Sequence, residues 1–166
     1  MTSLRIIGLA GLVACAVLAA APANAAYSCS VAVVGVNFGP YDPLPATPDD
    51  SAGRVDVTCT NVQGTGVDTV GYDVTLSPGT AGTYTPRQLA AGGERLNYNL
   101  YADGGRSQVW GNGSGGSVPV SGSMKVGPGV GNGSRTNRHD IFGRIPARQD
   151  VAAGVYSDTI VVTVTF

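Results

Sequence analysis

The sequence predicts an all-β sandwich, and three observations support that prediction. No stretch of the 166 residues shows sustained helical periodicity, and glycine is abundant, with 25 residues. Short runs of alternating apolar and polar side chains are separated by Gly, Pro, Asn and Asp, the residues that favour turns. Several short strands between such turns are typical of two antiparallel sheets packed face to face.

The alternating runs predict seven strands, in chain order. We expect them at about Cys29–Phe38, Arg54–Thr60, Val70–Ser77, Leu96–Tyr101, Val118–Val126, His139–Ile145 and Tyr156–Phe166. Proline-rich and glycine-rich segments interrupt them, at Pro40–Pro45, Pro78–Gly82 and Gly111–Gly116. The three prolines of the first segment remove three backbone donors, so that segment cannot be a central strand.

The buried face of several strands follows from their period of two. In the first strand Cys29, Val31 and Val33 share a face. The next three strands each place three apolar side chains on one face: Val55, Val57 and Cys59; Tyr72, Val74 and Leu76; and Leu96, Tyr98 and Leu100. We expect these rows to form the core.

The last predicted strand is the most hydrophobic one, and its inward row is Ile160, Val162, Val164 and Phe166. A row of this kind belongs beside another strand. No further strand follows it in the sequence, so we expect either an earlier strand or another molecule to cover it.

The N-terminus has the pattern of a secretory signal peptide. Arg5 precedes an apolar run from Ile6 to Ala21, and Ala23-Asn24-Ala25 forms a small-x-small cleavage site. We therefore expect a signal peptide over residues 1–25 and one exported domain over residues 26–166, secreted through the periplasm. A lipoprotein signal at Cys15, within Leu12-Val13-Ala14-Cys15, is an alternative.

Charge and cysteine content restrict the partners. Without Arg5 the chain has nine basic and eleven acidic side chains, with no run of either sign. This balance argues against nucleic acid and against an anionic membrane surface as a partner. In an oxidising compartment, Cys29 and Cys59 are expected to form one disulfide between the first two strands, and two buried thiols are the alternative.

Catalytic and metal-binding patterns are weak in this sequence. Gly111–Gly116 fits G-x-G-x-x-G by letter, but a strand-like segment with a proline follows where a dinucleotide site needs a helix. One histidine, His139, cannot complete a tetrahedral zinc site with two bonded cysteines. The acids Asp42, Asp49 and Asp50 lack the spacing of a calcium loop. We expect no enzyme activity, no metal and no cofactor.

Trp110 lies where a strand enters a glycine-rich turn. It could be a surface platform for a carbohydrate, but a core aromatic at the edge of the sandwich is the favoured interpretation because tryptophan buries a large area.

Motifs along nearly the whole chain resemble the spore coat protein U domain family. They are Val36–Pro43, Thr58-Cys59, Leu76–Gly79, Tyr84–Arg87, Leu96–Asp103, Val109–Gly111, Phe142–Ala147, Gln149 and Gly154–Thr159. Asn112, Phe142 and Arg148 stand where the family pattern would have Asp, Tyr and Gly. The resemblance covers residues 28–166.

That resemblance implies an immunoglobulin-like, pilin-type β-sandwich that is incomplete and lacks its final strand. A neighbouring subunit would then supply a strand by β-strand addition. The expected accepting groove is formed by Val31, Val33, Ile160, Val162, Val164 and Phe166. The expected partners are a periplasmic chaperone, an outer-membrane usher and neighbouring pilus subunits, with no insertion into the membrane.

The same resemblance implies an exported structural subunit of an archaic chaperone–usher fibre at the cell surface, with a role in adhesion and biofilm. Only Ala26, Tyr27 and Ser28 would precede Cys29 after cleavage, so we expect the chain to accept a strand without donating one, which suits the tip of a fibre. A spore-coat or envelope protein without strand exchange is the alternative, and a carbohydrate-binding module is a weaker one.

Overall fold

The computed structural model describes residues 27–63 and 65–166, and their strands form two antiparallel sheets. The predicted signal peptide and Cys15 lie outside these residues. The strands are β1 (Tyr27–Val34), β2 (Asp49–Asn61), β3 (Asp68–Leu76), β4 (Arg87–Ala91), β5 (Glu94–Tyr101), β6 (Val120–Val126), β7 (Ser134–Ile145) and β8 (Val162–Thr165). A short 3-10 turn, η1 (Gly131–Gly133), precedes β7. The all-β prediction is confirmed.

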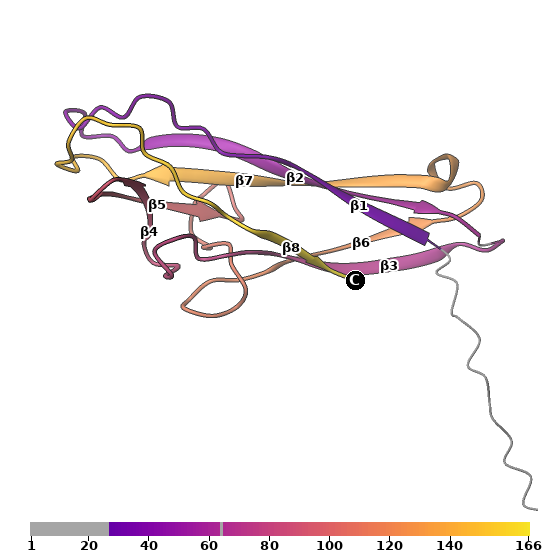
Figure 1. Ribbon diagram of the computed structural model, residues 1–166. Coiled ribbons are helices and arrows are strands. Elements are labelled where there is room, and N and C mark those ends of the chain that lie inside the picture. Colours follow the sequence, from indigo (N-terminus) through magenta and orange to yellow (C-terminus); the bar gives the residue numbers. More distant parts are fainter. Residues whose placement is uncertain (1–26, 64) are drawn as a thin grey trace, which may run out of the picture.

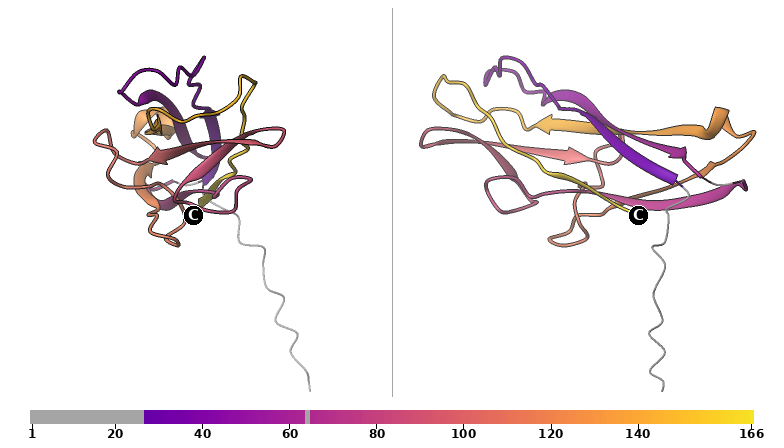
Figure 2. Two further views of the ribbon diagram at one scale, coloured as in Figure 1. Left: turned by 90° about the vertical axis from the view of Figure 1, so that its left-hand side faces the viewer. Right: turned by 45° about the vertical axis from the view of Figure 1, so that its right-hand side comes forward.

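The two sheets lie face to face along the length of the molecule (Figure 1). One has the strand order β1-β2-β7-β5-β4 and the other the order β6-β3-β8. The strand pairs β1 with β2 and β2 with β7 are antiparallel, and β3 pairs with both β6 and β8 in the same way. The views of Figure 2 show the same two layers from other directions.

The core contains the predicted rows of β2, β3 and β5, whereas Val31 and Val33 of the row predicted for β1 remain exposed. The inward side chains of β2, β3 and β5 are buried, and those of β6 and β7 complete the cluster, which includes Val55, Val57, Cys59, Val70, Tyr72, Val74, Leu76, Leu96, Tyr98, Leu100, Met124, Val126, Ile141 and Ile145. Burial of such side chains is the main force that holds the two sheets together.

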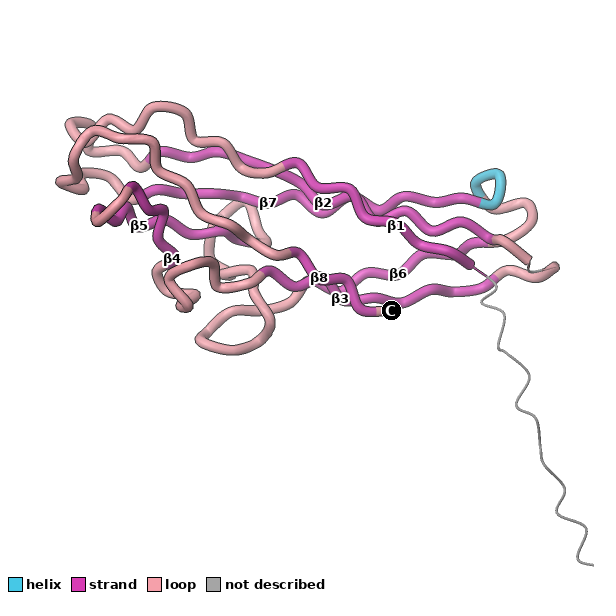
Figure 3. The backbone as a smooth tube through the Cα atoms, viewed as in Figure 1, coloured by secondary structure: helices cyan, strands magenta, loops and turns pink. Residues whose placement is uncertain are grey.

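Strand ends differ from the prediction where hydrogen bonding decides them. The last predicted strand begins at Tyr156, whereas β8 begins at Val162, because the preceding residues form an isolated bridge from Ser157 to Ala90 and no continuous ladder. Strand β4 was not predicted, and it pairs with β5 through a short hairpin. Figure 3 shows how much of the chain at one end of the sandwich consists of loops.

Among the described residues, the structure contains no helix long and apolar enough to span a membrane.

Candidate functional site: the open edge of the sandwich

Each sheet ends in two edge strands, and the four edges differ in how well other parts of the chain cover or protect them. The edge of β4 is covered, because the Ala90 amide donates to the Ser157 carbonyl at 2.9 Å and the Ser157 amide donates back at 3.1 Å. On the edge of β6, Asn137 Nδ2 donates to the Ser123 carbonyl at 2.9 Å, and the strand carries the charged Lys125. Charges and caps of this kind protect sheet edges from pairing with other chains.

The other two edges, β1 and β8, face each other along one side of the sandwich (Figures 1 and 2). Among the described residues β1 pairs with β2 alone and β8 with β3 alone, so no strand lies between them. Neither strand carries a charged side chain. We call this side the β1–β8 edge and define it by Val31 and Val33 of β1 and by Ile160, Val162, Val164 and Phe166 at β8.

The side chains of β1 point toward the core but remain exposed. Val31 lies opposite Val57 and Val33 opposite Val55, and both β2 partners are fully buried. Side chains directly opposite on paired strands share a face of the sheet. Val31 and Val33 therefore face the space between the sheets, yet they are 42% and 49% exposed. Nothing in the described chain covers this part of the core.

The backbone of β1 presents free hydrogen-bonding groups at the same two residues. The Cα atoms of Cys29 and Cys59 are 4.1 Å apart. So short a separation is typical of a cross-strand pair that exchanges no backbone hydrogen bonds. Val31 and Val33 follow at intervals of two, so their amides and carbonyls also point away from β2 and toward the open side.

The same geometry holds on β8. The Ser77 amide donates to the Val161 carbonyl at 2.9 Å, and the Val161 amide donates to Ser77 Oγ at 2.9 Å. Because backbone groups alternate along a strand, those of Val162 and Val164 point away from β3. Their side chains are half-buried against the core, as is that of Ile160, whereas Phe166 is 52% exposed.

The disulfide between Cys29 and Cys59 is present and joins β1 to β2. This prediction is confirmed. Because all eight residues of β1 pair with β2 in register, from Tyr27 opposite Asn61 to Val34 opposite Arg54, the bridge fixes one wall of the β1–β8 edge.

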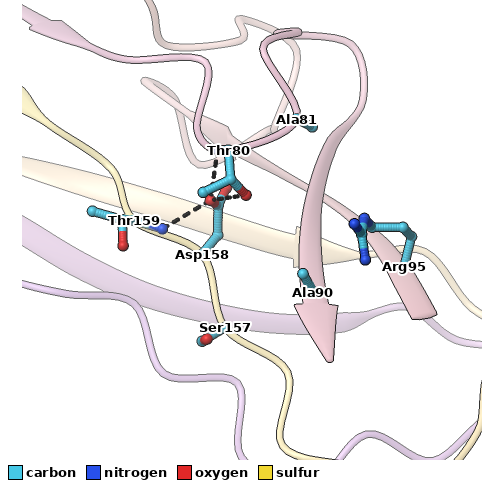
Figure 4. Close-up of a pocket in the computed structure, with 7 residues that line it drawn as sticks. All are labelled: Thr80, Ala81, Ala90, Arg95, Ser157, Asp158 and Thr159. Carbon is cyan, nitrogen blue, oxygen red and sulfur yellow. Dashed lines mark hydrogen bonds between the residues drawn. The ribbon is translucent and has the colours of Figure 1, made fainter. Parts of the chain in front are cut away.

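The segment before β8 is held by Asp158. Its Oδ1 accepts hydrogen bonds from the Thr80 amide at 2.8 Å, the Thr80 hydroxyl at 2.9 Å and the Thr159 amide at 2.8 Å (Figure 4). Its Oδ2 accepts from the Tyr98 hydroxyl at 2.7 Å. Burial raises the pKa of Tyr98, and the hydrogen bond to Asp158 raises it further. The carboxylate thus accepts four hydrogen bonds from the protein, and it lines a cavity of about 300 Å³ together with Arg95.

A second cavity, of about 700 Å³, continues the β1–β8 edge toward the loop end of the sandwich. The chain after β1 forms one side of it, with Val36 and Phe38, and the chain before β8 forms the other, with Val151 and Tyr156. Sequence reasoning missed this cavity, because it depends on two loops that approach each other only in the fold. The Tyr41 hydroxyl holds them together by donating to the Pro146 carbonyl at 3.1 Å and accepting from the Gln149 amide at 2.8 Å.

Trp110 is not a surface residue. Its side chain is fully buried, and its Nε1 donates to the Val74 carbonyl at 2.9 Å. The alternative of a surface ligand contact at Trp110 is therefore wrong, and the structure agrees with the favoured interpretation, a core aromatic. The indole packs into the sandwich because it buries a large apolar area and finds a partner for its one donor.

Two of the three acids that could have suggested calcium, Asp50 and Asp42, are engaged by other groups of the protein. Asp50 pairs with Arg144 at 2.7 Å and with Arg106 at 3.2 Å, and the hydrogen bond from Arg144 lowers the pKa of its carboxyl. Asp42 accepts a hydrogen bond from the Leu44 amide at 2.9 Å. Among the described residues, no cluster of three or more His, Cys, Asp or Glu side chains could hold a metal ion.

Comparisons with known proteins agree with this architecture. The family described as Spore Coat Protein U domain matches residues 14–163. A relative named Protein U, from Myxococcus xanthus, is 33% identical over 138 residues, which cover 79% of this chain and 71% of the relative.

A solved structure shares the fold. It is a chain in the crystal structure of the CsuC–CsuE chaperone–tip adhesion subunit pre-assembly complex from the archaic chaperone–usher Csu pili of Acinetobacter baumannii. The match has a TM-score of 0.50 and 21% identity, and it covers 84% of this chain but 40% of that chain. This likeness shows the fold, a pilin-like β-sandwich.

Proposed function

Because the chain belongs to the Spore Coat Protein U domain family, we propose that it is an exported, non-enzymatic subunit of an archaic chaperone–usher surface fibre. In this proposal it accepts a β-strand from another protein at the β1–β8 edge. The observation that carries the proposal is the exposure of Val31 and Val33, which face the core of the sandwich and have nothing over them.

An incoming strand would complete two ladders at once. The free amides and carbonyls of Val31 and Val33 on one side and of Val162 and Val164 on the other would pair with its backbone. Its alternate apolar side chains would cover the exposed row, which is how β-strand addition combines affinity with specificity. The contrast with β4 and β6, whose edges are covered or capped, supports this assignment of the open side.

The proposed partners follow from the same geometry. A periplasmic chaperone would occupy the edge first and keep the subunit soluble, an outer-membrane usher would export it, and a neighbouring subunit would replace the chaperone. The crystal structure of the Csu complex, a chaperone bound to a tip adhesion subunit, supports partners of this kind on a sandwich of the same fold. The chain would then reach the cell surface through the periplasm and serve in adhesion and biofilm.

The tip of the fibre is the proposed position. Strand β1 is bridged and paired from Tyr27 onward, so it cannot leave β2 to serve a neighbour. A donor segment would have to precede it, and the expected cleavage after Ala25 leaves one residue there. N-terminal sequencing of the exported protein tests this step, and immunogold labelling along the whole fibre shaft would refute the tip position.

The central experiment is complementation of the exported chain with a synthetic peptide of ten alternating valine and threonine residues. At a free peptide concentration of 100 times the Kd, binding stabilises the folded state by about 2.7 kcal/mol. We expect a higher melting temperature with this peptide and no change with an all-threonine peptide of the same length. Equal melting temperatures with both peptides would refute strand acceptance.

A coat or envelope protein without strand exchange is the second candidate. The description of the family and the relative named Protein U favour it. Neighbouring genes for a periplasmic chaperone and an outer-membrane usher would favour the fibre subunit, and a layer assembled without either would favour the coat protein. The carbohydrate-binding alternative loses its basis because Trp110 is buried.

A further inference from the structure

The single histidine of the chain lies inside the sandwich. His139 is on β7 directly opposite Val55, and Ile141, two residues further along β7, is buried. Residues at intervals of two share a face, so the imidazole points between the sheets. It is half-buried there.

Two aromatic rings hold the imidazole. His139 Nε2 lies 2.9 Å from the Tyr72 hydroxyl, and the ring centroids of Tyr72 and Trp110 lie 5.7 Å and 6.4 Å from that of His139. Tyr72 is 5% exposed and Trp110 is fully buried. A Cβ at Gly122 of β6 would overlap the Tyr72 ring, so the glycine leaves room for the phenol to reach His139.

No carboxylate forms an ion pair with His139 among the described residues. Its facing neighbours are Val55 from β2, Tyr72 from β3 and Trp110 from the loop after β5. Asp140, the next residue of β7, is the one charged group with an electrostatic effect on it. Burial lowers the pKa of His139, and Asp140 opposes this in part.

Tyr72 also connects His139 to the open side. The Phe166 ring, half exposed at the end of the β1–β8 edge, lies 5.9 Å from the Tyr72 ring. The three rings of Phe166, Tyr72 and His139 thus form a continuous path from the edge into the core. A strand that covers Phe166 would exclude water from the Tyr72 face beneath it.

Protonation of His139 disturbs this path. With its proton on Nδ1, the neutral imidazole accepts the Tyr72 hydroxyl hydrogen at Nε2. The imidazolium makes Nε2 a donor, so the hydroxyl hydrogen must find another acceptor. Among the described residues His139 is the one hydrogen-bond partner of that hydroxyl, so water would have to take its place. A covered edge makes both the cation and the displaced hydroxyl more costly.

We propose that His139, acting through Tyr72, makes strand acceptance sensitive to protons: proton uptake by His139 weakens the binding of a strand at the β1–β8 edge. This inference rests on the proposed function. By linkage, a strand that binds the neutral form better also makes the proton harder to add, by the same factor. Between pH 5 and 8 the effect can be assigned to His139, because histidine is the side chain whose ordinary pKa lies in that range and this chain has one histidine.

The test measures the Kd of the alternating valine–threonine peptide for the exported chain at pH 7.5 and pH 5.0, together with an NMR titration of the single imidazole. We expect the peptide to lower the pKa of His139, and the Kd to be higher at pH 5.0 than at pH 7.5, by up to about tenfold for each pKa unit of that change. His139→Asn keeps a hydrogen-bond acceptor without a titrating group and should abolish the pH dependence. Tyr72→Phe should reduce it.

The outcomes separate the two proposals. Binding with equal Kd at both pH values, or an imidazole pKa that the peptide leaves unchanged, overturns the proton coupling and leaves strand acceptance intact. An equal pH response in His139→Asn also overturns the coupling. A peptide that binds at neither pH refutes strand acceptance itself, and the coupling with it. The NMR titration of the unaltered chain decides the matter if a variant fails to fold.

Discussion

Replacing both bridged cysteines, Cys29→Ala with Cys59→Ala, is expected to destabilise the exported chain strongly. The bridge spans a sequence separation of 30 residues. In the chain-entropy model, closing a loop of this length removes about 3.6 kcal/mol of conformational freedom from the unfolded state at 25 °C. Cys59 is fully buried, so losing its sulfur contacts adds about 1 kcal/mol. The expected loss is therefore about 4–5 kcal/mol.

The location of the bridge means that its removal should loosen β1 more than the rest of the sandwich. Strand β1 pairs with β2 alone, and its inward side chains Val31 and Val33 remain largely exposed, so their burial contributes little to holding the strand in place. Without the bridge we expect β1 to detach before the rest of the sandwich unfolds. Amide hydrogen exchange should show early loss of protection in β1 while β3 and β7 remain protected.

Urea unfolding measures the total effect, and the fluorescence of the single, buried Trp110 reports it. With a denaturant slope of about 2 kcal/mol/M, the midpoint should fall by roughly 2 M. Ser28→Ala with Ser30→Ala is the matched control, because it places the same number of alanines on the exposed face of β1 and should cost less than about 0.5 kcal/mol. A loss below about 1 kcal/mol for the cysteine variant would refute the reasoning.

Three further perturbations test the core and the edge. Val164→Asp places a carboxylate on the inward row of β8 and should abolish soluble yield or fibre incorporation. The control Thr163→Asp lies on the outer face and should have little effect. Equal yields of the two variants would show that the inward row of β8 is not buried. Arg87→Lys should lower the free energy of unfolding by about 2–4 kcal/mol, measured by urea unfolding. The buried guanidinium donates to the carbonyls of Ser77 and Trp110 and to the Asn99 amide oxygen, and one ammonium cannot reach all three acceptors. An unchanged urea midpoint would contradict this expectation. The free energy of unfolding should fall as the pH decreases through 6.5 and level off below the lowered pKa of His139, because the unfolded chain binds the proton more readily. The variant His139→Asn should remove this pH dependence between pH 5 and 7.5. If the pH dependence survives in the variant, other groups cause it.

The sequence by itself determined which side chains face inward. Alternation fixes the direction of Val55, Val57 and Cys59 whatever the neighbouring strand is, because successive side chains of a strand point to opposite faces. The same rule predicted the inward rows of β3 and β5, and all of these residues are buried. The disulfide prediction followed from an export signal and two cysteines of the exported domain, Cys29 and Cys59, both on predicted inward rows.

Local pattern could not identify residues whose role depends on distant partners. Arg87 looks like a surface residue in the sequence, yet it is fully buried because acceptors from three separate segments converge on its guanidinium. In the sequence, His139 showed only that a tetrahedral zinc site could not be completed. Its contact with Tyr72, 67 positions earlier in the chain, exists only because β7 and β3 face each other across the core.

The alternation of side chains along the chain does not decide where the sandwich is open, and the tertiary structure does. A strand is an edge strand because of the order in which strands pair, and that order depends on contacts between residues far apart in the chain. The apolar row of β8 suggested a missing neighbour, and the family resemblance placed Val31 and Val33 on the other wall of the groove. The alternation of side chains along the chain could not give that placement by itself, since these two strands belong to different sheets. The exposure of Val31 and Val33, and the outward direction of their backbone groups, follow from that arrangement and from no property of the residues alone.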